Sequence, residues 1–171
     1  TGTAMGAVRR AGASAIEGEI GVGATVRLDY TVLQGREREF MRQLAGQEAG
    51  INKLTAGEIR SNIDSFNANG RPSSAGQAVA GFRRGNPLSE DPFVQAYLEK
   101  GFANGEPRFA ALHEPDMVIG GNSNGVTGYG DLSVNSSLGS QNRFHQNTIY
   151  QAVQLAPADS YIRFIFGVKK Q

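Results

Sequence analysis

The chain of 171 residues contains no cysteine, so a disulfide bond and a metal site built on thiolates are both excluded. Any bound metal ion has to be held by oxygen atoms or by imidazole. The formal net charge is only +1, which indicates neither a basic nucleic-acid-binding tail nor a membrane-surface patch. No apolar run is long enough to span a bilayer, and we expect no signal peptide at the start. At this length we expect a single domain with its own hydrophobic core. The lack of cysteine fits a protein of the reducing cytosol, and also a chain that is unfolded and moved between compartments.

Glycine, by contrast, is abundant, and its 23 residues gather mainly in two regions. The first region, residues 1–23, is also rich in alanine and serine, and we interpret it as a linker or as the remnant of a longer N-terminal region. From residue 25 to residue 32 apolar and polar residues alternate, which predicts a half-buried strand that ends at Gly35. We therefore divide the chain into an N-terminal extension with one strand, residues 1–35, and a main domain, residues 36–171.

Four segments in the first part of the main domain have the apolar spacing and the end signals of helices. One of them starts with a capping-box sequence, Thr55 to Glu58, and Pro92 fits the first turn of another. Met41 is expected on the buried stripe of the first. The expected helices cover residues 36–48, 55–69, 74–85 and 92–101.

Two more strands are expected in the second half, over residues 108–113 and 161–169, where every second residue is apolar. Between them the second glycine cluster, residues 120–130, is typical of a mobile loop. Residues 141–155 fit a helix, with a strand as the alternative, and we interpret His145 as a helix-face histidine. We predict an α+β fold with several packing helices against a small, mainly antiparallel sheet. That sheet is expected to contain both the strand ending at His113 and the C-terminal strand.

The most concentrated chemistry lies in the stretch Leu112-His113-Glu114-Pro115-Asp116-Met117-Val118-Ile119-Gly120-Gly121. Pro115 disfavours helix at the residue before it, so the chain should turn there. Histidine can take a proton from water near neutral pH, and a nearby aspartate can orient the imidazole or hold a divalent cation. Together they suit metal-assisted phosphodiester hydrolysis. The same pattern also fits a structural histidine at a strand end beside a turn aspartate.

With its surroundings, this stretch resembles the polymorphic toxin type fifteen family, which are nuclease domains at the C-termini of bacterial toxins and include DNase effectors of type VI secretion. The resemblance extends from about Arg36 to the end of the chain. Asn142 stands where an aromatic residue is expected in many relatives. The segments that carry the resemblance are Leu54–Glu58 with Asn62 and Asp64, Asn69–Arg71, His113–Gly121, Gly130–Asp131 and Val134–Gln141.

The resemblance implies metal-dependent DNA cleavage, with His113 as the general base and Asp116 as a metal ligand or orienting carboxylate. From its place after the glycine cluster, Asp131 is our candidate for a second oxygen ligand of the metal, Mg²⁺ or Mn²⁺. The residues expected to position the scissile phosphate are Asn135, Gln141 and Arg143.

The resemblance also implies partners: DNA, a cognate immunity protein, and a secretion apparatus or chaperone that contacts the N-terminal region. The protein would be made in the bacterial cytoplasm, secreted, and delivered into the cytoplasm of a target cell. Its nearly neutral charge predicts few, local contacts with the DNA backbone. Two alternatives remain open. One is another toxin enzyme, such as an RNase or a nucleotide-hydrolysing enzyme, and the other is a non-catalytic binding module in which His113 and Asp116 are structural.

Overall fold

The structure is a computed structural model that describes residues 9–11, 14–17, 25–70, 89–102, 109–123 and 126–169. Helices and strands are mixed along these residues, which confirms the predicted α+β class. The helix expected over residues 74–85 lies outside the described residues. The elements in chain order are β1 (Arg9–Ala11), β2 (Ser14–Glu17), β3 (Thr25–Tyr30), α1 (Glu37–Ile51), α2 (Ala56–Asn69), α4 (Pro92–Phe102), β4 (Phe109–His113), the 3-10 helix η1 (Met117–Ile119), β5 (Val126–Asp131), α5 (Leu132–Leu155) and β6 (Arg163–Val168).

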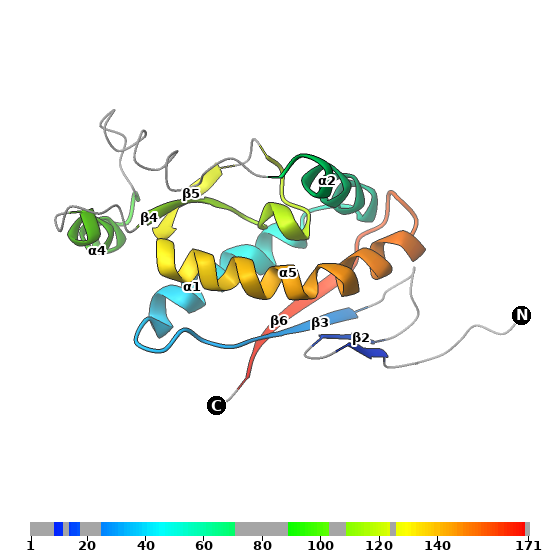
Figure 1. Ribbon diagram of the computed structural model, residues 1–171, viewed down its shortest axis with the longest axis horizontal. Helices are drawn as coiled ribbons and strands as arrows, with labels where there is room; N and C mark the ends of the chain where they lie inside the picture. The colour runs from blue at the N-terminus through cyan, green and yellow to red at the C-terminus, as the bar shows by residue number, and fades with distance from the viewer. Residues whose placement is uncertain are drawn as a thin grey trace, which may run out of the picture.

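The described strands form two separate sheets, and helices α1 and α5 lie between them (Figure 1). One sheet has the order β1-β2-β3-β6, with β3 and β6 parallel, and the other is the antiparallel pair β4-β5. The prediction that one sheet contains both the strand ending at His113 and the C-terminal strand is therefore wrong. The reason is that β6 matches β3 residue for residue, with Val26 beside Phe164 and Leu28 beside Phe166, and all four side chains are buried.

Side chains of helix α1 cover the outer edge of β6. Asn52 forms two hydrogen bonds with the main chain of Phe164, of 2.9 Å to its carbonyl oxygen and 2.8 Å from its amide. Glu48 accepts a hydrogen bond of 2.8 Å from the Phe166 amide. Unpaired groups at a sheet edge otherwise invite pairing with another chain. These contacts close the edge and tie the larger sheet to α1.

The N-terminal region adds more to the fold than the single predicted strand. Residues 9–11 and 14–17 form β1 and β2, which pair antiparallel with each other and with β3. In β3, Val26, Leu28 and Tyr30 are fully buried and belong to the same core cluster as the helices. The domain boundary at residue 35 remains a prediction, but β3 contributes directly to the main core.

Two predictions for the second half need correction. The glycine cluster was expected to be a loop, yet residues 126–131 form β5, whose backbone groups pair with β4. The helix expected from residue 141 begins nine residues earlier, at Leu132, because Asp131 caps it and its buried face already starts at Val134. Residues 124 and 125 lie outside the described part of the chain.

The predicted helix starts are confirmed for α2 and α4. Thr55 Oγ1 accepts a hydrogen bond of 3.2 Å from the Glu58 amide, the Glu58 carboxylate accepts one from the Thr55 amide, and α4 begins at Pro92. Met41 was expected to be buried but is 47% exposed, because it points about 100° around α1 from the centre of the buried stripe that contains Phe40 and Leu44. Among the described residues, no helix has the length and apolar character needed to cross a membrane.

Candidate active site

Residues 113–121, which we name the HxxD loop, follow directly on β4. The strand ends at His113, and the Glu114–Pro115 peptide bond after it is cis. Asp116 then starts η1, with its Oδ1 accepting a hydrogen bond of 3.2 Å from the Val118 amide. The turn predicted at Pro115 is confirmed. The loop leaves His113 at a strand end and fixes Asp116 as the cap of a short helix.

The two glycines at the end of the HxxD loop permit close packing. Gly120 has φ +112°, and a Cβ built there would lie 2.8 Å from Cγ2 of Ile59 in α2. A Cβ at Gly121 would overlap the carbonyl oxygen of Pro115. Side chains at either position would therefore collide with fixed neighbours, and at Gly120 would also be strained. These two glycines therefore let the loop fold tightly on itself and against α2.

Gln47 of helix α1 connects the two motif residues through their main chain. Its Nε2 donates a hydrogen bond of 2.8 Å to the carbonyl oxygen of His113, and its Oε1 accepts one of 2.6 Å from the amide of Asp116. The side chain is only 3% exposed. A single buried amide thus spans the turn between the imidazole-bearing and the carboxylate-bearing residue.

Two other helices hold the same loop with side-chain amides. Asn62 of α2 donates a hydrogen bond of 2.9 Å to the carbonyl oxygen of Gly120. Gln146 of α5 donates one of 2.8 Å to the carbonyl oxygen of Val118. We call Gln47, Asn62 and Gln146 the amide clamp. Because its members come from three separate helices, the shape of the HxxD loop depends on the whole helical layer.

The Asp116 carboxylate is buried and lies at the end of a polar chain. Nδ2 of Asn142 lies 3.5 Å from Asp116 Oδ2, and the Tyr30 hydroxyl donates a hydrogen bond of 2.6 Å to Asn142 Oδ1. Burial raises the pKa of Tyr30 well above its ordinary value, and the charge of Asp116 raises that pKa further. Tyr30 therefore stays a neutral hydrogen-bond donor. Asn142, at the position where an aromatic residue was expected, serves to link β3 to the loop.

The His113 imidazole is largely covered, with 9% of the residue exposed. Its Nε2 lies 3.3 Å from the carbonyl oxygen of Ser123. A carbonyl can only accept, so this contact assigns the proton of neutral His113 to Nε2 and leaves the lone pair on Nδ1. Nδ1 is then the atom of His113 that can take a proton.

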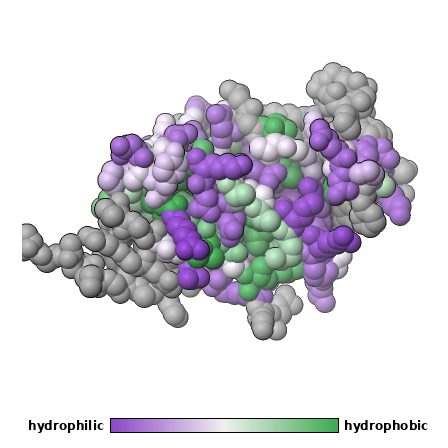
Figure 2. Space-filling model, turned by 180° about the vertical axis from the view of Figure 1, so that it is seen from behind, coloured by the Kyte–Doolittle hydropathy of each residue, from purple (hydrophilic) through white to green (hydrophobic). Residues whose placement is uncertain are grey.

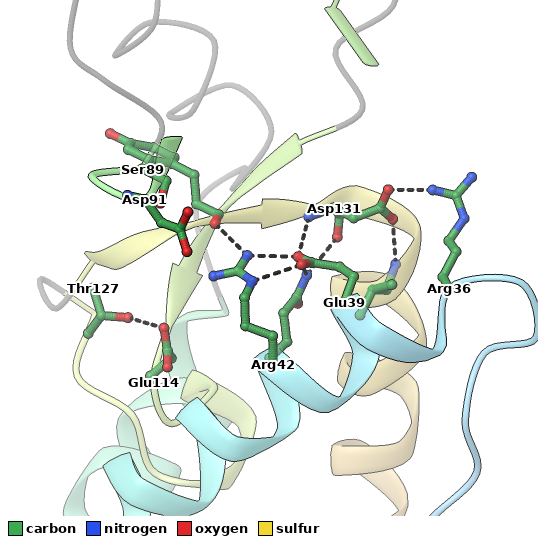
Figure 3. A network of polar contacts seen from close by, with 11 residues as sticks. Arg36, Glu39, Arg42, Ser89, Asp91, Glu114, Thr127 and Asp131 are labelled. Carbon is green, nitrogen blue, oxygen red and sulfur yellow. Dashed lines mark hydrogen bonds and ion pairs between the residues drawn. The ribbon is translucent and has the colours of Figure 1, made fainter. Parts of the chain in front are cut away.

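Asp131, the predicted second metal ligand, has a structural position at the start of α5 (Figure 3). Its Oδ1 accepts a hydrogen bond of 3.0 Å from the Val134 amide, and its Oδ2 forms an ion pair with Arg36. Its main chain is held by α1, because the Asp131 amide donates to Glu39 and its carbonyl oxygen accepts from Gln43. The Asp131 carboxylate therefore caps α5 and connects it to Arg36, the residue that precedes α1.

Glu39 is the centre of the network that surrounds Asp131. Arg42 donates two hydrogen bonds of 2.8 Å to its carboxylate, and Gln43 donates a third. Burial raises the pKa of Glu39, but these hydrogen bonds and the one from the Asp131 amide outweigh it, so the pKa lies below its ordinary value. Arg42 also donates a hydrogen bond of 3.0 Å to the carbonyl oxygen of Tyr129. The network fastens the end of β5 to α1 (Figure 3).

The predicted phosphate-positioning residues face in different directions on α5. Gln141 pairs with the main chain of Thr31, accepting a hydrogen bond of 2.7 Å and donating one of 2.9 Å, so it faces β3. Asn135 is half-buried and lies two turns before Asn142, on the side of α5 that meets the HxxD loop. Arg143 is exposed. Two turns span about 10 Å along the axis, so Asn135 shares a face with Asn142 but lies well before it.

His145 has a structural setting, as the sequence suggested. It is 1% exposed, its Nε2 lies 2.9 Å from the carbonyl oxygen of Asp29, and its ring packs edge-on against Tyr30. Burial lowers the pKa of His145, although the Asp29 carbonyl and carboxylate raise it in part. This histidine helps to anchor α5 on β3.

A pocket of about 430 Å³ lies between α1 and the HxxD loop. The Glu114 carboxylate is in its lining and accepts a hydrogen bond of 2.8 Å from the Thr127 hydroxyl. Lys53 and Asn122 contribute the other polar side chains. The pocket lies along one side of the HxxD loop, and Glu114, the residue between His113 and Pro115, lines it.

Sequence reasoning missed Gln47 and Asn142, although a signal for both was present. In α1 the buried positions Phe40, Leu44 and Ile51 are spaced so that Gln47 completes their stripe. In α5 Asn142 occupies a place of the same kind among buried residues. A polar side chain at an expected core position has to find a buried partner. In both helices that partner is the HxxD loop.

Comparison with known protein families finds a family model that matches most of the chain. A family model described as Novel toxin 15 matches residues 34–162. The matched region contains the HxxD loop, all three helices of the amide clamp and Asn142, and it begins close to the boundary predicted at residue 35. No curated protein matches the chain.

Proposed function

The chain belongs to the Novel toxin 15 family, a family of polymorphic toxins, and on this premise we propose that it kills target bacteria by hydrolysing DNA phosphodiester bonds without sequence preference. The observation that supports this best is the HxxD loop itself. Three helices hold it in one conformation, and it carries a histidine that can take a proton three residues before a buried carboxylate. Such preorganisation is what a catalytic loop requires.

In the proposed reaction His113 is the general base. Nδ1 takes a proton from the attacking water, while the Ser123 carbonyl holds the ring through Nε2. Asp116 is a metal ligand or the carboxylate that orients the site. Asn135 and Arg143 would bind the scissile phosphate, and Arg143 would stabilise the charge that develops on it. Gln141 remains a candidate from the resemblance, but to reach a phosphate it would first have to leave Thr31.

We propose Mg²⁺ or Mn²⁺ as the cofactor. In the described part of the chain, no group of three His, Cys, Asp or Glu side chains is placed to hold a metal ion. One carboxylate is nevertheless a sufficient protein contribution for Mg²⁺, which usually keeps several waters and binds substrate phosphate oxygens. Asp116 is our candidate for that carboxylate: its Oδ1 accepts from the Val118 amide, whereas its Oδ2 has a long contact of 3.5 Å with Asn142. When bound, the ion would neutralise charge on the phosphate.

Asp131 has two competing roles. The sequence suggested a second metal ligand, whereas its contacts with Val134 and Arg36 support a helix cap and an ion pair. A guanidinium beside the carboxylate competes with a dication for the same oxygens. We therefore base the proposed site on Asp116 and treat Asp131 as the support of α5.

The surface supports local contacts with DNA. The net charge is +1, and Figure 2 shows polar and apolar side chains interspersed on the face turned away from the viewer in Figure 1. A few basic side chains, among them the exposed Arg143, would bind backbone phosphates without reading bases.

We further propose that an immunity protein protects the producing cell, and that the N-terminal region engages a secretion apparatus or chaperone. The toxin would be made in the bacterial cytoplasm and act in the cytoplasm of the target cell. The function is tested by incubating the protein with plasmid DNA, bulk RNA and NAD in parallel, with and without a chelator. Cleavage confined to RNA or NAD would replace the proposed substrate. No reaction with any of the three would favour a binding module.

A further inference from the structure

We propose that Gln47 is a positioning residue of the active site, which sets the relative placement of His113 and Asp116. The proposal rests on the proposed function. Its basis is the pair of hydrogen bonds from one buried amide, of 2.8 Å to the His113 carbonyl oxygen and 2.6 Å from the Asp116 amide. Nothing in the motif predicts this residue, because it lies 66 residues before His113 in the chain.

The two bonds act on the part of the loop that determines where both side chains point. A carbonyl oxygen and an amide nitrogen belong to the peptide planes beside the two Cα atoms, so holding them fixes the position of each Cα and restricts the direction of each Cα–Cβ bond. Misplacement of a reacting group by 1 Å can lower a rate about 10²-fold. Gln47 therefore affects the reaction through geometry and does not touch the substrate.

Helix α1 is shaped to bring Gln47 this close. A Cβ at Gly50 would overlap the main chain of Glu114, and a Cβ at Gly46 would overlap the Glu114 carboxylate. The helix thus packs directly on the loop backbone at Gly50 and on the Glu114 side chain at Gly46. Since Phe40, Leu44 and Ile51 on the same stripe are buried, Gln47 is locked in place by the core.

Replacement by glutamate gives a specific test, because only its protonated form can imitate the amide. A neutral carboxylic acid can accept from the Asp116 amide and donate to the His113 carbonyl oxygen, whereas a carboxylate can only accept. A carboxylate at this position would face the His113 carbonyl oxygen with no proton to donate, and burial disfavours its charged form. Protonation should therefore restore the bridge at the lower end of the pH range.

Gln43 provides the matched control, one turn earlier in the same helix. It is 2% exposed, and its Nε2 donates two hydrogen bonds, to Glu39 and to the Asp131 carbonyl oxygen, neither of which belongs to the HxxD loop. Gln47→Met and Gln43→Met both remove a buried amide and both should lower the melting temperature. Only Gln47→Met also removes the two hydrogen bonds that connect the main chains of His113 and Asp116.

The experiment measures kcat and KM for plasmid cleavage between pH 5.5 and 9 for wild type, Gln47→Met, Gln47→Glu and Gln43→Met. We expect Gln47→Met to lower kcat about 10²-fold with little change in KM, and Gln43→Met to lower it less than about tenfold. The ratio of Gln47→Glu to wild-type kcat should rise as the pH falls, because only the protonated acid can donate to the His113 carbonyl oxygen. Equal losses of kcat in Gln47→Met and Gln43→Met would overturn the proposal. So would a Gln47→Glu protein whose kcat relative to wild type is the same as that of Gln47→Met at every pH.

A second readout separates this proposal from the proposed function. The NMR resonances of the His113 imidazole and the Asp116 carboxyl carbon should shift in Gln47→Met and stay in place in Gln43→Met, whatever the substrate. Unshifted resonances in Gln47→Met would refute the positioning role even in an inactive protein. If cleavage depends on His113 but is unaffected in Gln47→Met, the positioning role of Gln47 is refuted and the proposed function stands. If the resonances shift but the wild type does not cleave DNA, only the proposed function is refuted.

Discussion

The Tyr30 hydroxyl donates a hydrogen bond of 2.6 Å to Oδ1 of Asn142, and this contact turns the Asn142 amide so that its Nδ2 faces Asp116. The two residues are 112 positions apart, in the first strand of the main core and in its longest helix. The contact is buried, so neither group can turn to water if its partner is lost. Tyr30 thus supports the proposed site without belonging to the motif.

Tyr30→Phe tests this support. It removes one hydroxyl and leaves Oδ1 of Asn142 buried without that donor, so we expect a loss of about 1–3 kcal/mol in the free energy of unfolding. Plasmid cleavage should fall as well, because the Asn142 amide is free to turn away from Asp116. Urea unfolding curves and nicking rates measure the two effects.

Tyr150→Phe is the control for that variant. The Tyr150 hydroxyl donates a hydrogen bond of 2.8 Å to Asp64 at the surface, where water can replace it. We expect a much smaller change in stability and unchanged cleavage. Equal effects of the two variants would mean that the Tyr30 hydroxyl has no special part in the site.

Asp131→Asn distinguishes a helix cap from a metal ligand. Asparagine caps helices as well as aspartate does, so only the ion pair with Arg36 is lost, which is worth about 0–1 kcal/mol for a pair that is partly exposed. We therefore expect cleavage within about threefold of wild type, since the geometry of α5 is kept. Asp131→Ala, which removes the cap too, should be less stable by about 0.5–2 kcal/mol. If Asp131→Asn instead lost cleavage at an unchanged melting temperature, the carboxylate would be a ligand after all.

Removal of metal should stop cleavage. We expect EDTA to abolish nicking and added Mg²⁺ or Mn²⁺ to restore it, because an ion at Asp116 would neutralise charge on the phosphate. Asp116→Asn keeps an oxygen for the Val118 amide and should fold, but it should not regain wild-type activity at any Mg²⁺ concentration. Cleavage that survives exhaustive chelation would favour a histidine mechanism without metal.

The dependence of activity on salt should be modest. Each phosphate contact that releases a counterion contributes about −0.9 to the slope of log affinity against log salt concentration on duplex DNA. With a net charge of +1 and few local contacts, the slope should be shallow. DNA binding measured between 50 and 200 mM salt with a catalytically inactive His113→Ala protein gives this slope. A slope as steep as that of a strongly basic DNA-binding protein would contradict local binding.

Local features of the fold could be predicted from the sequence because they depend on neighbouring residues. The capping box at Thr55, the start of α4 at Pro92 and the turn at Pro115 are of this kind. The pairing of β6 with β3 could not be predicted, because two alternating strands do not identify each other across the whole length of the chain. The same limit hid Gln47, whose partners lie in another segment.

Asp131 shows a second reason for an incomplete prediction. The sequence Asp131-Leu132-Ser133-Val134 is a normal helix start, yet it follows a glycine cluster that resembles a loop. Close packing against α1 explains Gly130 of β5, where a Cβ would lie 2.5 Å from Nε2 of Gln43, but not Gly128, where a Cβ would meet no atom within 4 Å. Glycine chosen for close packing cannot be distinguished in a sequence from glycine chosen for mobility.

The central claim is that His113, at the end of β4, takes the proton of the water that cleaves DNA. Digestion of supercoiled plasmid by wild type and by His113→Ala, with Mg²⁺ titrated in, tests it most directly. We predict Mg²⁺-dependent cleavage by the wild type and a rate lower by about 10²–10⁴-fold for the variant, at a melting temperature within a few degrees of wild type. Cleavage by a folded His113→Ala protein at close to the wild-type rate would contradict the claim.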